Sequence, residues 1–126
     1  GKIVTSLTWT APDETGAQAL RDFFDFHKQY MIEKSHKEGP LKLIQYVIAE
    51  APEYKEDGNV WIQGKFPEKT GRIVFHHYEI CETADGLHHH WIDGAQFLPE
   101  LLGMLDTYNI ELRMNNQIKA IHSLWN

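Results

Sequence analysis

The segment at residues 72–93, RIVFHHYEICETADGLHHHWID, runs from a strand pattern directly into a helix pattern and carries five of the eight histidines. Residues 73–82 are rich in β-branched and aromatic types. Their alternation places on one face Ile73, Phe75, His77, Glu79 and Cys81. Thr83 is a predicted helix N-cap, because its hydroxyl can accept a hydrogen bond from the first helical turn. A strand must therefore be followed at once by a helix here.

Strand-like alternation and helix-like spacing succeed one another along the rest of the chain. The expected strands are residues 2–10, 41–51, 73–82 and 110–124, the last of them bent near Asn115 and Asn116. The expected helices are residues 11–37, 83–93 and 95–108. This order predicts one α+β domain over residues 1–126, of the ferredoxin-like βαββαβ type with an antiparallel sheet.

Residues 52–71 are expected to form a long connection between the middle strands, because proline, glycine and charged residues gather there. A short strand or flap at residues 59–65 is predicted within it. Long loops on compact scaffolds often cover ligands, so a lid and a surface decoration are both open interpretations.

Composition limits the classes of partner. A chain of 126 residues that is 42% hydrophobic and 24% charged is typical of one globular domain. A net charge of -6 without a Lys/Arg cluster argues against nucleic acid. No apolar run reaches the roughly 20 residues of a spanning helix, and no signal pattern begins the sequence. We expect a cytoplasmic protein with one free cysteine, Cys81, and no membrane partner.

Each predicted strand offers apolar side chains on both faces, whereas both helices of a ferredoxin-like domain cover only one face of the sheet. The second face needs a cover. We therefore predict a homodimer that forms through this sheet face.

The chain resembles the antibiotic biosynthesis monooxygenase-like (ABM) domain family over most of its length. The residues that carry the resemblance are Glu38-Gly39 before a strand with Tyr46, the FxxYE arrangement of Phe75 to Glu79, the segment from Ala84 to Leu87 with His90 three residues on, and the helix at 97–105. The resemblance implies a dimeric α+β barrel built from ferredoxin-like subunits. The connection at residues 52–71 is longer than the usual hairpin of this family.

The resemblance also implies a cofactor-independent monooxygenase that binds a phenol- or quinol-type aromatic substrate between helices and sheet. Such a reaction needs desolvation, orientation and proton transfer. The candidate catalytic residues are His90, His76 and His77. The candidate substrate-binding residues are Tyr78, Trp91 and Phe75. We interpret His27, on the apolar stripe of the first helix, as a buried histidine with a local partner rather than a catalytic one.

Other functions remain open on the same residues. A metal site competes, because imidazole is a common ligand. Consecutive helical residues point about 100° apart, so His88, His89 and His90 cannot all meet one ion. The acid of a facial triad would have to be Glu79 or a remote carboxylate, and we expect no metal and no other cofactor. A haem-binding or haem-degrading relative is a lesser alternative. A non-catalytic dimeric module that binds a small ligand or has a structural role is the alternative from another class.

Overall fold

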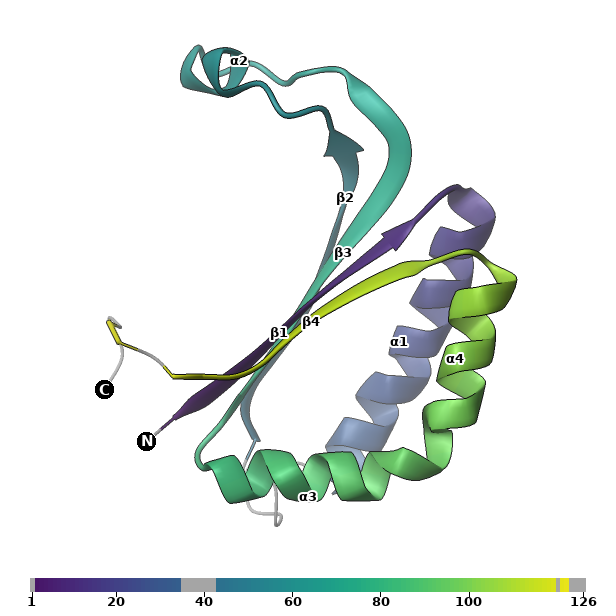
Figure 1. The fold of residues 1–126 in the computed structure, drawn as a ribbon, viewed down its shortest axis with the longest axis vertical. Helices are drawn as coiled ribbons and strands as arrows, with labels where there is room; N and C mark the ends of the chain where they lie inside the picture. Colours follow the sequence, from purple (N-terminus) through teal and green to yellow (C-terminus); the bar gives the residue numbers. More distant parts are fainter. Residues whose placement is uncertain (1, 35–42, 120, 123–126) are drawn as a thin grey trace.

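The structure is a computed structural model, which describes residues 2–34, 43–119 and 121–122. The predicted α+β class is confirmed: a four-stranded antiparallel sheet has α1, α3 and α4 on one side (Figure 1). In chain order the elements are β1 (Ile3–Ala11), α1 (Glu14–Lys34), β2 (Leu43–Tyr54), α2 (Gly58–Ile62), β3 (Lys69–Cys81), α3 (Ala84–Gly94), the 3-10 turn η1 (Ala95–Phe97), α4 (Leu98–Thr107) and β4 (Glu111–Lys119).

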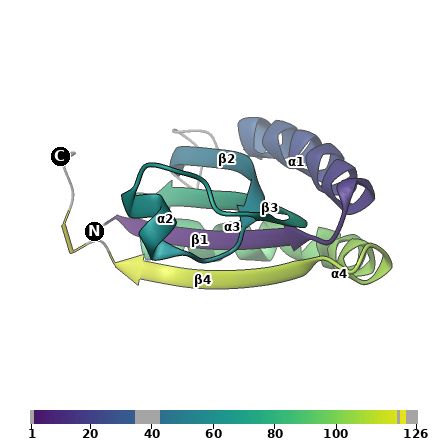
Figure 2. The same ribbon diagram turned by 90° about the horizontal axis from the view of Figure 1, so that it is seen from above.

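The strands lie side by side in the order β2-β3-β1-β4, and Figure 2 shows β3 and β1 as the inner pair. In the β1–β3 ladder, Thr5 lies opposite Glu79 and Leu7 lies opposite His77. In the β2–β3 ladder, Tyr46 lies opposite Glu79. Directly opposed residues on neighbouring strands point to the same face. The register therefore gathers Thr5, Glu79 and Tyr46 on the helix side of three adjacent strands.

The predicted alternation of β3 is confirmed, since Phe75, His77 and Glu79 are buried while His76 is exposed. The inner face of the sheet packs against α1. The main core cluster consists of Leu7, Trp9, Ala11, Ala17, Leu20, Phe24, Phe75 and Ile110. Leu20 is fully buried, and residues of this kind contribute most of the free energy of folding. The core thus fixes α1 across β1 and β3.

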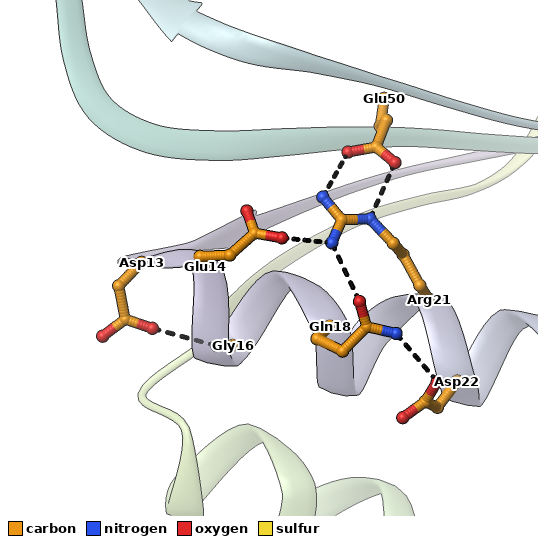
Figure 3. Close-up of polar contacts among 7 residues, drawn as sticks. All are labelled: Asp13, Glu14, Gly16, Gln18, Arg21, Asp22 and Glu50. Carbon is orange, nitrogen blue, oxygen red and sulfur yellow. Dashed lines mark hydrogen bonds and ion pairs between the residues drawn. The ribbon is translucent and has the colours of Figure 1, made fainter.

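Polar contacts hold α1 to the sheet at its first turns. Asp13 Oδ1 accepts a hydrogen bond from the Gly16 N–H at 2.9 Å, which caps the helix start. Arg21 forms a two-pronged pair with Glu50 of β2, with both N–O distances at 2.9 Å (Figure 3). The same guanidinium also bonds Glu14 on its own helix. These contacts set the direction in which α1 crosses the sheet.

The second helical region bends around the end of the sheet. The predicted cap at Thr83 is confirmed, because its Oγ1 accepts a hydrogen bond from the Gly86 N–H at 3.1 Å. In Figure 1, α3 runs across the ends of α1 and α4, and η1 turns the chain into α4. Pro99 lies in the first turn of α4, where it removes no helical hydrogen bond.

The predicted connection at residues 52–71 is wrong in extent, because β2 continues to Tyr54 and β3 already begins at Lys69. The two strands form a long hairpin whose tip bends to the side of the sheet opposite α1, α3 and α4 (Figure 1). Of the short strand or flap expected at residues 59–65, the strand is wrong. The chain forms the short helix α2 there, capped by Asp57, whose side chain accepts a hydrogen bond from the Val60 N–H.

The predicted bend in the last strand coincides with a shift of register in the β1–β4 ladder between Val4 and Ser6, whose partners are Ile118 and Asn115. The end of the predicted first helix, the start of the predicted second strand and the Glu38-Gly39 motif lie outside the described residues. Among the described helices, none is long and apolar enough to cross a membrane. The dimeric barrel stays a prediction.

Candidate functional site

A cavity of about 380 Å³ lies between the sheet and the helices α1, α3 and α4. Its apolar wall is formed by Leu7, Trp9, Phe23, Phe26, Phe97, Leu98, Leu101, Leu102, Leu105, Leu112 and Met114, with Tyr30 and Trp91 beside them. Its polar side chains are Thr5, His27, His77, Glu79 and His90. A mostly apolar cavity with a few polar groups is typical of a small-molecule site.

Glu79 on β3 is the buried acid of this cavity, with 2% of its surface exposed. Its Oε1 lies 2.8 Å from His77 Nε2. On the other side of the His77 ring, the Trp9 indole N–H donates to Nδ1 at 3.4 Å. Because Nδ1 accepts, Nε2 carries the proton and donates to the carboxylate. The Trp9–His77–Glu79 chain therefore fixes the position of one carboxylate oxygen.

His90 on α3 faces the second carboxylate oxygen of Glu79. Its Nε2 lies 3.7 Å from Oε2, which is too long for a hydrogen bond. Its Nδ1 is buried and has no hydrogen-bond partner. The Thr5 hydroxyl, on the strand next to Glu79, is also buried without a partner. Within the described part of the chain these are the two unpartnered buried side-chain atoms, and both belong to residues that line the cavity.

His27 on α1 completes the cluster. Its Nδ1 lies 2.9 Å from the Tyr46 hydroxyl of β2. The centroid of its ring lies 5.4 Å from that of His77 and 5.9 Å from that of His90. Three histidines from two helices and one strand therefore surround the Glu79 carboxylate.

Burial sets the protonation of the cluster. Burial lowers the pKa of His27 to about 4. The nearby Glu79 raises this pKa, whereas the neighbouring His77 and His90 lower it further. Burial opposes ionisation of Glu79, but the hydrogen bond from His77 and the nearby histidines outweigh it and lower its pKa. Burial raises the pKa of Tyr46. At neutral pH the site thus holds a neutral His27, a neutral Tyr46 phenol and a Glu79 carboxylate.

The structure brings together three of the six predicted site residues: His77, His90 and Trp91 all line the cavity. His76 and Tyr78 are excluded from it, because alternate residues of β3 point to opposite faces and these two lie on the face away from the helices. Phe75 lies on the inner face, but its side chain is buried in the core below α1 rather than in the cavity wall.

The sequence indicates Glu79 only as a possible acid of a metal site, and it predicts neither His27 nor Thr5 as a site residue. Glu79 had a usable signal: it is a charged residue on the same strand face as Phe75 and His77, and buried charges need partners. His27 lies on an apolar helical stripe, where the expected local partner is indeed present as Tyr46. Thr5 had no signal, because a threonine in a strand is ordinary.

Of the two interpretations left open for residues 52–71, the lid is not supported. No residue of the 52–71 segment lines the cavity, and the tip of the hairpin lies on the opposite side of the sheet (Figure 1).

No protein-family model, no curated protein and no solved structure matches this chain. The resemblance to ABM domains therefore stays a prediction.

Proposed function

We propose that the cavity binds a flat phenol- or quinol-type molecule and that the protein oxidises it as a cofactor-independent monooxygenase. One observation carries the proposal: the unpartnered Thr5 hydroxyl and His90 Nδ1 both belong to residues that line a mostly apolar cavity. Buried polar atoms without partners are rare in folded proteins. A ligand with hydroxyl groups on an aromatic frame would satisfy both atoms and fill the apolar wall.

His90 is the proposed general base. A substrate hydroxyl near its ring transfers a proton to the free nitrogen, and the resulting imidazolium faces the Glu79 carboxylate across the 3.7 Å gap. Proton transfer shortens this contact into a charge-assisted pair. His77 and Trp9 hold the carboxylate in place, as the orienting groups of a buried acid–base pair do.

The oxidation itself needs no external reductant. The deprotonated aromatic substrate is electron-rich and supplies the electrons to dioxygen. At an activated CH₂ group, two C–H bonds are replaced by a carbonyl, and one oxygen atom stays in the product. The other oxygen atom leaves as water, which takes up the proton that His90 had accepted. The apolar wall contributes by excluding bulk water from the anion.

The ferredoxin-like subunit is proposed to pair with a second copy through the outer face of its sheet. This face carries the partly exposed side chains of Val47, Val74 and Tyr78. Sedimentation at micromolar concentration should give twice the 14.7 kDa chain mass. A mass of one chain would exclude the dimer.

The proposed activity is tested by oxygen uptake with a panel of quinols and anthrones, using tag-free, chelator-treated protein. We expect uptake with at least one compound, loss of uptake in His90→Ala and no loss in His89→Ala, since His89 is the exposed neighbour on the same helix. Saturable binding without uptake would replace the enzyme with a non-catalytic ligand-binding module. Absence of binding by the whole panel would contradict both functions.

A further inference from the structure

We infer that His27, Glu79 and His90 form a binding site for one divalent first-row transition-metal ion. One nitrogen of each histidine and one oxygen of Glu79 lie within 4.8 Å of one another. The three residues come from α1, β3 and α3, which pack on one another at the polar part of the cavity. Two imidazoles and one carboxylate are the ligand set of many catalytic transition-metal sites.

The spacing suits a shared ion. Metal–nitrogen and metal–oxygen bonds of about 2.0–2.2 Å separate neighbouring ligand atoms by roughly 3–3.5 Å. His90 Nε2 and Glu79 Oε2 are 3.7 Å apart. This gap is too long for a hydrogen bond and only slightly longer than two ligands of one ion require. Small side-chain rotations would bring the whole set, now within 4.8 Å, to bonding distance.

Two of the three ligands are already held by outer partners. His27 Nδ1 contacts the Tyr46 hydroxyl at 2.9 Å, which leaves Nε2 as the nitrogen for an ion. Glu79 Oε1 is held by His77, which leaves Oε2. Metal-binding histidines and carboxylates characteristically have such outer hydrogen bonds, which orient the lone pairs. The Tyr46 and His77 contacts therefore match the outer hydrogen bonds that orient the ligands of a metal site.

Charge and exposure also favour an ion. The Glu79 side chain is only 3% exposed, and the Glu79 carboxylate is costly to bury without a matching positive charge. A divalent cation would supply that charge. Three protein ligands leave the remaining coordination positions open to the cavity, as in catalytic rather than structural sites. Imidazole ligands favour Zn²⁺, Fe²⁺, Co²⁺ or Ni²⁺ over Mg²⁺ and Ca²⁺.

This site does not rest on the proposed oxygenase activity. Neutral His90 has one lone pair, which would accept the substrate proton on Nδ1 in one tautomer and bind the ion on Nε2 in the other. The metal-bound and the metal-free base are therefore alternative states of one cluster. Added Zn²⁺ should accordingly suppress oxygen uptake by the chelator-treated protein. Metal binding and oxygen uptake are measured in separate experiments, so each proposal can be contradicted while the other stands.

The test is titration of tag-free, chelator-treated protein with Co²⁺, followed by visible d–d absorption, with calorimetric stoichiometry and Zn²⁺ competition. We expect one ion per chain and displacement by Zn²⁺. Glu79→Gln and His90→Gln should each weaken binding about tenfold or more. His89→Gln is the matched control and should bind as the wild type does. Circular dichroism and thermal unfolding check that each variant is folded.

His90→Gln keeps the test decisive if Glu79→Gln does not fold, because the change would break no hydrogen bond between His90 and the described residues. No saturable Co²⁺ absorption in the wild type would overturn the inference. Equal loss of binding in His89→Gln and His90→Gln would also overturn it, since the ion would then be held by the exposed histidines of α3.

Discussion

His90 Nε2 lies 3.7 Å from Glu79 Oε2, which is longer than a hydrogen bond. The other oxygen of the same carboxylate is hydrogen-bonded by His77 at 2.8 Å. Glu79 thus has one oxygen that the fold has fixed and one that faces a histidine without a hydrogen bond. The chemistry proposed for the cavity depends on this difference between the two oxygens.

Stability should fall between pH 6.5 and pH 4 because of His27. Its pKa is about 4 in the folded protein and 6.5 when exposed, so the unfolded chain binds more protons in this window. The stabilisation is complete above pH 6.5 and is lost as the pH falls towards 4, by roughly 3 kcal/mol at most. Urea unfolding of wild type and His27→Gln measures it. An identical pH slope in both proteins would contradict the assignment.

Leu20→Ala should destabilise the protein by about 2–5 kcal/mol, because Leu20 is fully buried between α1 and the sheet and truncation leaves a void. The matched control is Ile92→Ala on α3, where the side chain is 61% exposed and a change of less than about 0.5 kcal/mol is expected. Denaturant unfolding compares the two. Similar losses in both variants would show that the core is misplaced.

Leu98→Trp should block the cavity without unfolding the protein. Leu98 lines the cavity but is 49% exposed, so a larger side chain can turn towards the space it borders. Binding of a quinol, followed by quenching of tryptophan fluorescence, should weaken about tenfold or more, while Leu98→Ala should bind within a few-fold of wild type. Unchanged affinity in Leu98→Trp would place the ligand elsewhere.

Cys81 should react slowly with thiol reagents in the native state. Its side chain is 2% exposed, and burial together with the nearby Glu79 raises the pKa of the thiol to about 11. Both effects reduce the accessible thiolate. Reaction with a chromogenic disulfide should become fast only in urea. A native rate equal to that of the unfolded chain would mean that the β3–α3 junction opens readily.

Much of the fold could be predicted from the sequence, because the two inner strands, β1 and β3, bury one face along most of their length. The alternation of β3 separates His76 from His77 correctly, and the Thr83 cap marks where α3 begins. The helix α2 could not be predicted, since five residues carry no periodic signal and its position depends on the hairpin beside it. Its ring contacts to Tyr54 and Phe66 form only when the hairpin has closed.

The candidate site was less accessible to sequence reasoning. Leu101 and Leu105 on α4 have the same apolar spacing whether they face a filled core or a cavity, so the pattern predicts the helix and not the empty space. The rotation between consecutive helical residues correctly predicted that His90 points in a different direction from His88 and His89. The convergence of His27 with Glu79 depends on the angle at which α1 crosses the sheet, which side-chain packing sets.

The most direct test of the central claim uses a phenol whose anion absorbs at a longer wavelength than its neutral form. At a pH below the solution pKa of this phenol, binding to chelator-treated wild type should produce the anion spectrum, because His90 takes the proton and Glu79 stabilises the imidazolium. His90→Gln should bind the phenol in its neutral form. A neutral bound phenol in the wild type, or an equal anion signal in His90→Gln, would contradict the proposed proton transfer.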